Sequence, residues 1–340
     1  MRNGNDRTVL VLGATGGIGG EVARTLLARG WNVHAMRRGA PPAAGDRITW
    51  HEGDAMNASD VLRAARGARV IVHAVNPPGY RRWSELVLPM MDNTIAAAKA
   101  VGARVVLPGT VYNFGPDTFP VPREDAPQRP LTRKGAIRVE MERRLRDSGV
   151  PAIVVRAGDY FGPRVKTSSW FAQGLVKAGA PVTTITQPGR PGVGHQWAYL
   201  PDVAETIARL LERDQPGTGF ERFHMAGHWD PDGTRMAEAI TRAATQAGLP
   251  APRLRRFPWA LAMLAAPFVP LLREVREMRY LWEQPIQLQN ERLAAALGSE
   301  PHTPWDEAVA ATLAGLGCLP TPRDSGRARA SGVTVPPSQP

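Results

Sequence analysis

The chain has 340 residues, of which 43% are hydrophobic, and 42 basic against 31 acidic side chains give it a formal net charge of +11. This length allows a large core and a smaller second lobe, and the interleaving of basic with acidic residues argues against a nucleic-acid partner. A single cysteine, Cys318, excludes an intrachain disulfide, and the seven histidines lack the paired spacing of a metal site. The polar N-terminus resembles no secretory signal, so we expect a cytoplasmic protein.

The first predicted element is an apolar, β-branched strand at residues 8–12, followed by a loop of sequence GATGGIG and a helical pattern over residues 21–29. Glycines between a strand and a helix let the backbone approach a pyrophosphate at the helix N-terminus. The GxxGxxG spacing in this context predicts a dinucleotide site. Its expected contacts are Gly13, Thr15, Gly16, Gly17, Ile18 and Gly19.

The second predicted strand, residues 31–36, ends where an adenosine ribose is expected, about 20 residues after the glycine loop. An NAD site places an acidic residue there, whereas this chain has Arg37 and Arg38. Two guanidinium groups can bind a 2′-phosphate, which favours NADP over NAD. The alternative is a solvated basic turn.

Further apolar runs predict strands at residues 48–52, 69–74, 104–107 and 152–156, with helices at 134–147 and from Pro201-Asp202 onward. The alternation predicts a doubly wound, Rossmann-type α/β sheet. We expect residues 1–165, completed by 196–225, to form the NADP-binding domain. Residues 166–195 and 226–320 should form a mostly helical substrate lobe, and residues 321–340 a disordered tail.

The uncharged segment at residues 257–272 contains three prolines and is too short to cross a bilayer. Its apolar character predicts a buried helical hairpin or a roof over a pocket. The alternative is an interfacial membrane contact, with Arg253, Arg255 and Arg256 alongside.

Later motifs support a family assignment. They are Gly53-Asp54, Ala74-Val75-Asn76, Arg156-Ala157-Gly158-Asp159-Tyr160-Phe161-Gly162-Pro163-Arg164, Trp197-Ala198-Tyr199-Leu200-Pro201-Asp202-Val203-Ala204 and Leu297-Gly298. Together with the glycine loop they resemble extended or atypical short-chain dehydrogenases/reductases of the NAD-dependent epimerase/dehydratase type, from residue 8 to about 317. The resemblance implies that Asp54 binds the adenine and that Ala55, Ala74, Val75 and Asn76 line the cofactor.

The expected catalytic centre departs from this family, whose members use a Ser or Thr, a Tyr, and a Lys four residues after the Tyr. Thr110 matches the Ser/Thr position, but the chain contains no YxxxK sequence. One register places Lys134 at the Tyr position and Arg138 at the Lys position, 24 and 28 residues after Thr110. A second register pairs Lys134 with the family lysine and leaves Leu131 near the Tyr position.

Three alternatives follow for the chemistry. Lys134 acts as proton donor while Thr110 orients the substrate oxygen, as the isoflavone-reductase-like branch implies; or another pocket group gives the proton; or the fold binds NADP without turnover and regulates a partner. A solvated face of a helix is the bland interpretation of Lys134 and Arg138. The expected pocket residues are Tyr112, Asp159, Tyr160, Trp170, His195 and Trp197.

The favoured prediction is an NADPH-dependent oxidoreductase or epimerase-like enzyme that acts on a carbonyl or alcohol carbon of a small molecule. Family resemblance also implies a homodimer formed through the helices at residues 84–101 and 134–147.

Overall fold

The computed structural model describes residues 7–40, 47–77, 82–166, 169–213 and 219–320. The predicted disordered tail, residues 321–340, lies outside the described residues.

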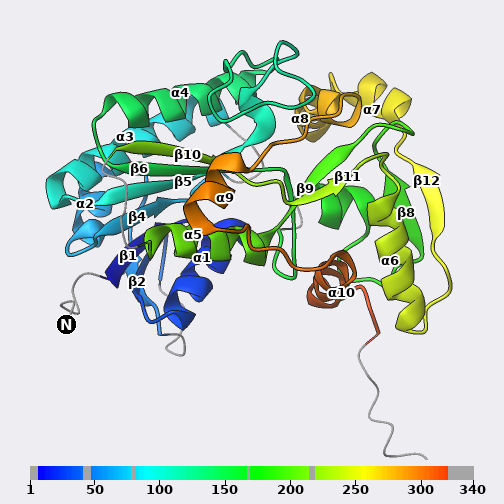
Figure 1. Ribbon diagram of the computed structural model, residues 1–340, viewed down its shortest axis with the longest axis horizontal. Coiled ribbons are helices and arrows are strands. Elements are labelled where there is room, and N and C mark those ends of the chain that lie inside the picture. The colour runs from blue at the N-terminus through cyan, green and yellow to red at the C-terminus, as the bar shows by residue number, and fades with distance from the viewer. Residues whose placement is uncertain (1–6, 41–46, 78–81, 167–168, 214–218, 321–340) are drawn as a thin grey trace, which may run out of the picture.

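A seven-stranded parallel sheet forms the larger half of the protein (Figure 1), in the order β10-β6-β5-β4-β1-β2-β3. Its strands are β1 (Thr8–Leu12), β2 (Asn32–Arg37), β3 (Thr49–Glu52), β4 (Val70–His73), β5 (Arg104–Thr110), β6 (Ala152–Ala157) and β10 (Phe220–His224). The order reverses between β1 and β4, which is where doubly wound sheets bind ligands. The predicted fold class is therefore confirmed, and each strand expected before residue 160 is present.

Helices cover both faces of the sheet because alternate side chains of each strand point to opposite sides. Val9 and Val11 pack toward α1 (Gly17–Ala28) and α5 (Leu200–Leu211), whereas Leu10 and Leu12 belong to the core on the other face. That second face is covered by α2 (Ala58–Ala65), α3 (Trp83–Val101) and α4 (Arg133–Asp147). All five residues of β1 are buried, which explains its run of valines and leucines after Thr8.

A smaller lobe lies beside the carboxyl ends of the strands (Figure 1). It contains a sheet of β11, β9 and β7 and a pair formed by β12 and β8. Its strands are β7 (Asp159–Phe161), β8 (Thr184–Gln187), β9 (His195–Tyr199), β11 (His228–Asp230) and β12 (Arg253–Arg256). Its helices are the π-helix η4 (Trp170–Leu175), α6 (Arg235–Gln246), α7 (Trp259–Ala265), α8 (Pro270–Glu277), the 3-10 helix η5 (Arg279–Trp282) and α10 (Trp305–Gly315).

Two features of the lobe differ from the expectation of a helical region with a buried hairpin. Strands continue after residue 226, because β11 and β12 pair with partners from earlier in the chain. The segment at 257–272 forms α7 and the start of α8, but it exposes Leu261, Leu264 and Phe268. The prediction of a buried helical hairpin is therefore wrong: the small side chains Ala262 and Ala266 face the protein instead.

The chain finally returns to the larger half. Helix α9 (Glu291–Leu297) contacts α5 and β10, and its Leu293 is fully buried in the core beneath them. Residues 226–320 thus contribute to both halves of the protein rather than to the substrate lobe alone.

Candidate functional site

The glycine loop joins β1 to α1 in a conformation that requires glycine. Gly13 has φ +88°, and a Cβ there would lie 2.4 Å from the Ala74 carbonyl oxygen. A Cβ on Gly19 would lie 2.3 Å from the Gly13 carbonyl oxygen. Helix α1 is preceded by Gly16, which supplies no side-chain cap, and its first turn has no acidic residue. This cradle fits a pyrophosphate, because backbone N–H groups at a helix N-terminus bind anions.

Arg37 and Arg38, at the end of β2, lie beside the turn that contains Asp54, the residue predicted to bind the adenine. Arg37 is half-buried and Arg38 is exposed, and the Arg37 carbonyl accepts a hydrogen bond from Gly53 at 3.0 Å. The Asp54 carboxylate accepts from the backbone N–H of Met56 at 3.0 Å, so it stabilises its own turn. The side chain of Ala55 packs in the core.

At the end of β4, Ala74 closes against Gly13 while Asn76 faces helix α4. The Asn76 amide oxygen accepts from the Arg138 guanidinium at 3.3 Å. That guanidinium also lies 5.1 Å from the centre of the Trp83 ring. Arg138 therefore reaches from α4 to the sheet edge at which β4 ends.

Lys134 and Arg138 lie on one face of α4, and this face is buried. Their exposed fractions are 4% and 9%, which rules out the interpretation of a solvated i,i+4 face. Thr132 caps the helix by accepting from Gly135 at 3.0 Å, and the Lys134 backbone N–H donates to Glu277 at 2.8 Å. A Cβ on Gly135 would lie 2.2 Å from the Tyr112 carbonyl oxygen, so α4 begins directly against the segment after Thr110.

Thr110 ends β5 and begins a single turn, η3 (Val111–Asn113). Its hydroxyl accepts from the Tyr112 N–H at 3.3 Å, and the Tyr112 hydroxyl donates to Asp159 at 3.5 Å. The other oxygen of Asp159 lies 3.0 Å from His195 Nε2. Residues from β5, β7 and β9 are thus joined in one hydrogen-bonded chain.

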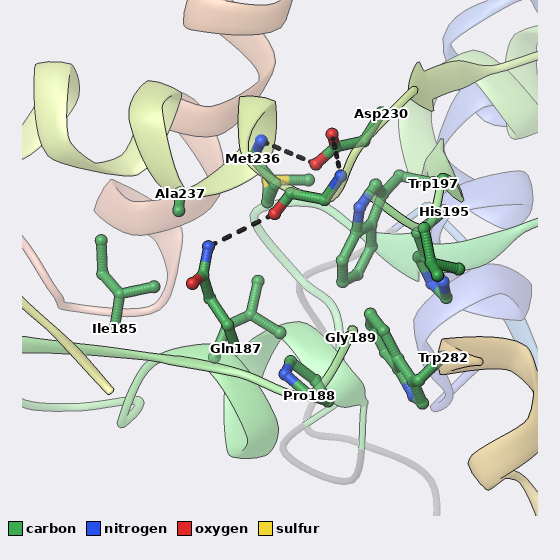
Figure 2. A pocket seen from close by; sticks show the side chains of 14 residues that line it. Ile185, Gln187, Pro188, Gly189, His195, Trp197, Asp230, Met236, Ala237 and Trp282 are labelled. Atoms are coloured by element: carbon green, nitrogen blue, oxygen red, sulfur yellow. Dashed lines mark hydrogen bonds between the residues drawn. The ribbon is translucent and has the colours of Figure 1, made fainter. Parts of the chain in front are cut away.

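His195 is held from three sides. Its Nδ1 lies 3.2 Å from the Leu281 carbonyl oxygen, and its ring stacks on Trp282 with centroids 3.7 Å apart. Figure 2 shows these two rings facing each other beside Trp197. They line a cavity of about 20 Å³, roughly the space for one water molecule. On its far side Gln187 donates to the Gly233 carbonyl and Asp230 accepts from Met236.

The six predicted pocket residues therefore differ in placement. His195 and Trp197 line this cavity, and Asp159 and His195 line a second one of about 10 Å³. Tyr112 joins them through Asp159, whereas Trp170 packs behind Trp282 with ring centroids 5.1 Å apart. The Tyr160 hydroxyl is buried without a hydrogen-bond partner among the described residues, and burial raises its pKa to about 12, so it is a poor proton donor near neutral pH.

Sequence reasoning missed the residues that arrive from the end of α8 and from η5. Glu277, Leu281 and Trp282 contact Lys134 and His195 across more than 80 residues of sequence. No local pattern marks them, because their neighbours on the chain follow an ordinary helical periodicity. The aromatic residues at 280 and 282 are the only hint.

A buried ion pair lies beneath the turn that follows Thr110. Arg156 is fully buried, donates from Nε to Glu142 at 3.0 Å, and lies 2.9 Å from His224 Nε2. The same Glu142 carboxylate accepts from the Asn113 amide at 2.9 Å. The turn after Thr110 is thereby fixed to α4 and β6.

A second cluster brings together Asp202, His228 and His302, whose nearest polar atoms lie within 4.8 Å of one another. Spacing along the chain did not predict this proximity. Asp202 accepts two hydrogen bonds from Thr303, and His228 Nε2 lies 2.7 Å from the Thr303 carbonyl oxygen. The contacts tie α5 and β11 to the chain before α10.

Three buried histidines make stability depend on pH. Burial, together with the charge of Arg138 near His73 and of Arg156 near His224, lowers the pKa of His73, His224 and His228 to about 3, 2 and 4. Unfolded histidine titrates near 6.5, so the unfolded chain binds more protons below that pH, and acid destabilises the fold. We expect the free energy of unfolding to fall by roughly 1 kcal/mol per histidine for each pH unit below about 6.5.

Urea denaturation between about pH 7.5 and pH 5 measures this slope. The variant His224→Gln keeps an acceptor for Arg156 and should give a shallower slope, because it removes one titrating group. Identical slopes for the two proteins would contradict the assignment.

Comparison with known proteins gives the family. The sequence profile of the NAD dependent epimerase/dehydratase family matches residues 9–226, well over half of the chain. A 3-diazoavenalumate denitrifying reductase from a Streptomyces species is 34% identical over 174 residues. These residues are 46% of this chain and 57% of that protein, so the match spans little more than half of the relative's length.

Solved structures at lower identity share the fold. The Bordetella bronchiseptica enzyme WbmH in complex with NAD+ has a TM-score of 0.66 at 21% identity, covering 91% of this chain and 97% of that one. The dTDP-glucose 4,6-dehydratase DesIV from Streptomyces venezuelae, with NAD and TYD bound, has a TM-score of 0.66 at 18% identity and covers 91% and 96%. With its glycine cradle, its strand order and this profile match, the chain belongs to the NAD dependent epimerase/dehydratase family.

Proposed function

We propose that this protein is an NADPH-dependent reductase that adds hydride to a carbonyl carbon of a small molecule. The observation that carries the proposal is the buried face of α4: Lys134 and Arg138 point inward at the edge where β4 and β5 end. Buried lysine and arginine side chains are rare, and buried ionisable groups are concentrated at functional sites. The dinucleotide, held by the Gly13 cradle and the N-terminus of α1, supplies the hydride.

The residues around this edge have separable roles. Thr110 orients the substrate oxygen by hydrogen bonding, and Lys134 donates a proton to it as hydride reaches the carbon, so that the C=O group becomes CH–OH. Arg138 positions Asn76 and adds positive charge to the site. The chain Tyr112–Asp159–His195 connects the turn after Thr110 to the cavity beside His195.

A second candidate reaction follows from the named relative, which is a denitrifying reductase of a diazo compound. When hydride replaces a diazonium group, dinitrogen leaves and the carbon gains hydrogen, so no proton is needed. A chain without the family's tyrosine and its partner lysine suits such chemistry. In this case Lys134 would serve binding alone.

Cofactor preference is predicted to depend on Arg37. Replacing it with alanine removes a partner of the 2′-phosphate, and a charge-assisted hydrogen bond to a charged group is worth about 1.5–3 kcal/mol, or roughly a 10- to 100-fold change in Kd. We expect Arg37→Ala to weaken NADPH by that factor and NADH by less than twofold. Calorimetric titration measures both, with the exposed Arg66→Ala as control; equal losses for the two cofactors would refute the 2′-phosphate assignment.

Turnover tests the proposed function itself. Purified protein is titrated with NADPH and then assayed for NADPH oxidation with aldehydes, ketones and aryl diazonium salts. Oxidation with carbonyl compounds supports the reductase, and oxidation with diazonium salts alone supports the second candidate. Tight NADPH binding without turnover on the whole panel would instead indicate a regulator that binds NADP. The homodimer through α3 and α4 and the cytoplasmic location stay predictions.

A further inference from the structure

Exposed apolar side chains are concentrated in one part of the lobe. Nine large hydrophobic side chains are exposed in the described part of the chain, and five of them lie between residues 254 and 269. They are Leu254 (59%), Leu261 (67%), Leu264 (74%), Phe268 (85%) and Val269 (40%). Single exposed hydrophobic residues are normal, but a cluster of this kind marks an interaction surface.

Helix α7 is amphipathic, but its large apolar side chains face the solvent and its small ones face the protein. Leu261, Leu264 and Phe268 are spaced i, i+3 and i+7, which places them on one face of a helical path, and this face is exposed. The side turned to the protein carries Ala262 and Ala266, at 8% and 0% exposure. A helix that serves only the core of its own protein buries its large apolar side chains, whereas this one exposes them. The exposed face is therefore suited to contact an apolar surface outside the protein.

Basic side chains adjoin this helix. Strand β12 leads into α7 with only Phe257 and Pro258 between them, and Arg253, Arg255 and Arg256 of that strand are all exposed. None of the three forms an ion pair with a described residue. Residues 253–273 hold four arginines and no acidic residue. We call Leu254, Leu261, Leu264, Phe268 and Val269, with these three arginines, the basic apolar face.

Figure 1 shows β12 at the edge of the lobe away from the large sheet, and α7 at the top of the lobe next to α8. The start of α7 is fixed, because Trp259 donates from its indole N–H to the Pro188 carbonyl at 2.7 Å and packs against Trp170. The exposed leucines are thus presented on an anchored helix. None of the helices in the described ranges has the length and apolarity needed to span a bilayer.

We propose that the basic apolar face seats the protein on an anionic phospholipid surface. Leu261, Leu264 and Phe268 would enter the boundary between headgroups and acyl chains, and the β12 arginines would meet lipid phosphates. Apolar side chains on one side and guanidinium groups alongside are the combination that binds interfacial helices to anionic membranes. An apolar partner protein would not require the arginines, and the chain's net charge of +11 also favours an anionic surface.

Vesicle sedimentation of the full chain tests the proposal. We expect binding to phosphatidylcholine vesicles that contain about 30 mol% phosphatidylglycerol, and little binding to phosphatidylcholine alone. Raising the salt from about 0.1 M to 1 M should weaken the binding, because screening shortens the range of the charges. The double variant Leu264→Ser, Phe268→Ser should bind at least tenfold more weakly, and Arg255→Glu, Arg256→Glu should lose the preference for phosphatidylglycerol.

The control is Leu62→Ser, an equally apolar exposed position on α2, which should bind as the unaltered protein does. Absence of binding to the anionic vesicles overturns the proposal, and so does equal binding by the control and the double variant. Sedimentation velocity without lipid gives the remaining outcome: a dimer that Leu264→Ser, Phe268→Ser dissociates would show that the face joins two copies of the chain. NADPH binding should be unchanged in all of these variants, so the result is independent of the proposed reductase activity.

Discussion

Replacing Lys134 with methionine is expected to lower kcat for carbonyl reduction by about 10²- to 10⁴-fold, the usual contribution of a positioned acid, while NADPH affinity stays within a few-fold. Lys134 is 4% exposed and lies in the first turn of α4, where a positive charge opposes the helix dipole. Glu277 lies beside it, since its carboxylate accepts from the Lys134 backbone N–H at 2.8 Å. The burial of this lysine next to the turn that follows Thr110 is the reason to expect it to act on the substrate.

Two further variants make this result specific. Lys134→Arg keeps a positive charge but cannot release a proton, so it should be nearly as inactive as Lys134→Met if the lysine is the acid. Lys99→Met, on the exposed side of α3, is the matched control and should leave kcat unchanged. Normal carbonyl reduction by Lys134→Met would contradict the assignment of Lys134 as the proton donor. Loss of carbonyl reduction with diazonium reduction retained would separate the two candidate reactions, because only the first consumes a proton.

Replacing Arg156 with methionine should lower the free energy of unfolding by about 3–5 kcal/mol, because it leaves the Glu142 carboxylate buried without its cation. The Glu142 side chain is 5% exposed and the Arg156 side chain 0%. The loss is a large share of the stability of a typical domain. Because Glu142 also holds Asn113, the turn after Thr110 should loosen as well.

Urea unfolding measures this loss of stability, and an exposed ion pair on α4 provides the control. Arg143 is half exposed and pairs with Glu140 and Asp147 on the outer side of α4. Exposed pairs contribute about 0–1 kcal/mol, so Arg143→Met should cost little. The double variant Arg156→Met, Glu142→Met removes both charges and should recover part of the loss. A cost for Arg156→Met no larger than that for Arg143→Met would contradict the role given to the buried pair.

Local sequence was sufficient wherever the structure depends on neighbouring residues. The glycine loop and the buried strand β1 both follow from short-range chemistry. Gly13 could be assigned from sequence because only glycine tolerates both its positive φ and the approach of the Ala74 carbonyl. The alternation of predicted strands and helices also indicated an α/β fold.

The sequence failed at the segment of residues 257–272 for a clear reason. Hydrophobicity predicts that a side chain avoids water, but it does not say whether the apolar partner belongs to the same protein. The uncharged segment was therefore expected to be buried. In the structure, Ala262 and Ala266 are buried against the rest of the protein, whereas Leu264 and Phe268 are exposed.

By itself, the sequence determined the class of fold and the position of the glycine loop, and it contains no YxxxK sequence. Only the tertiary structure decided that Lys134 and Arg138 are buried, that Asp159 joins Tyr112 to His195, and that Trp282 stacks on that histidine. The physical reason is range. Turns, caps and strand periodicity are set by residues a few positions apart, whereas these contacts join residues between 36 and 143 positions apart, and they form only when packing of the whole chain brings the elements together.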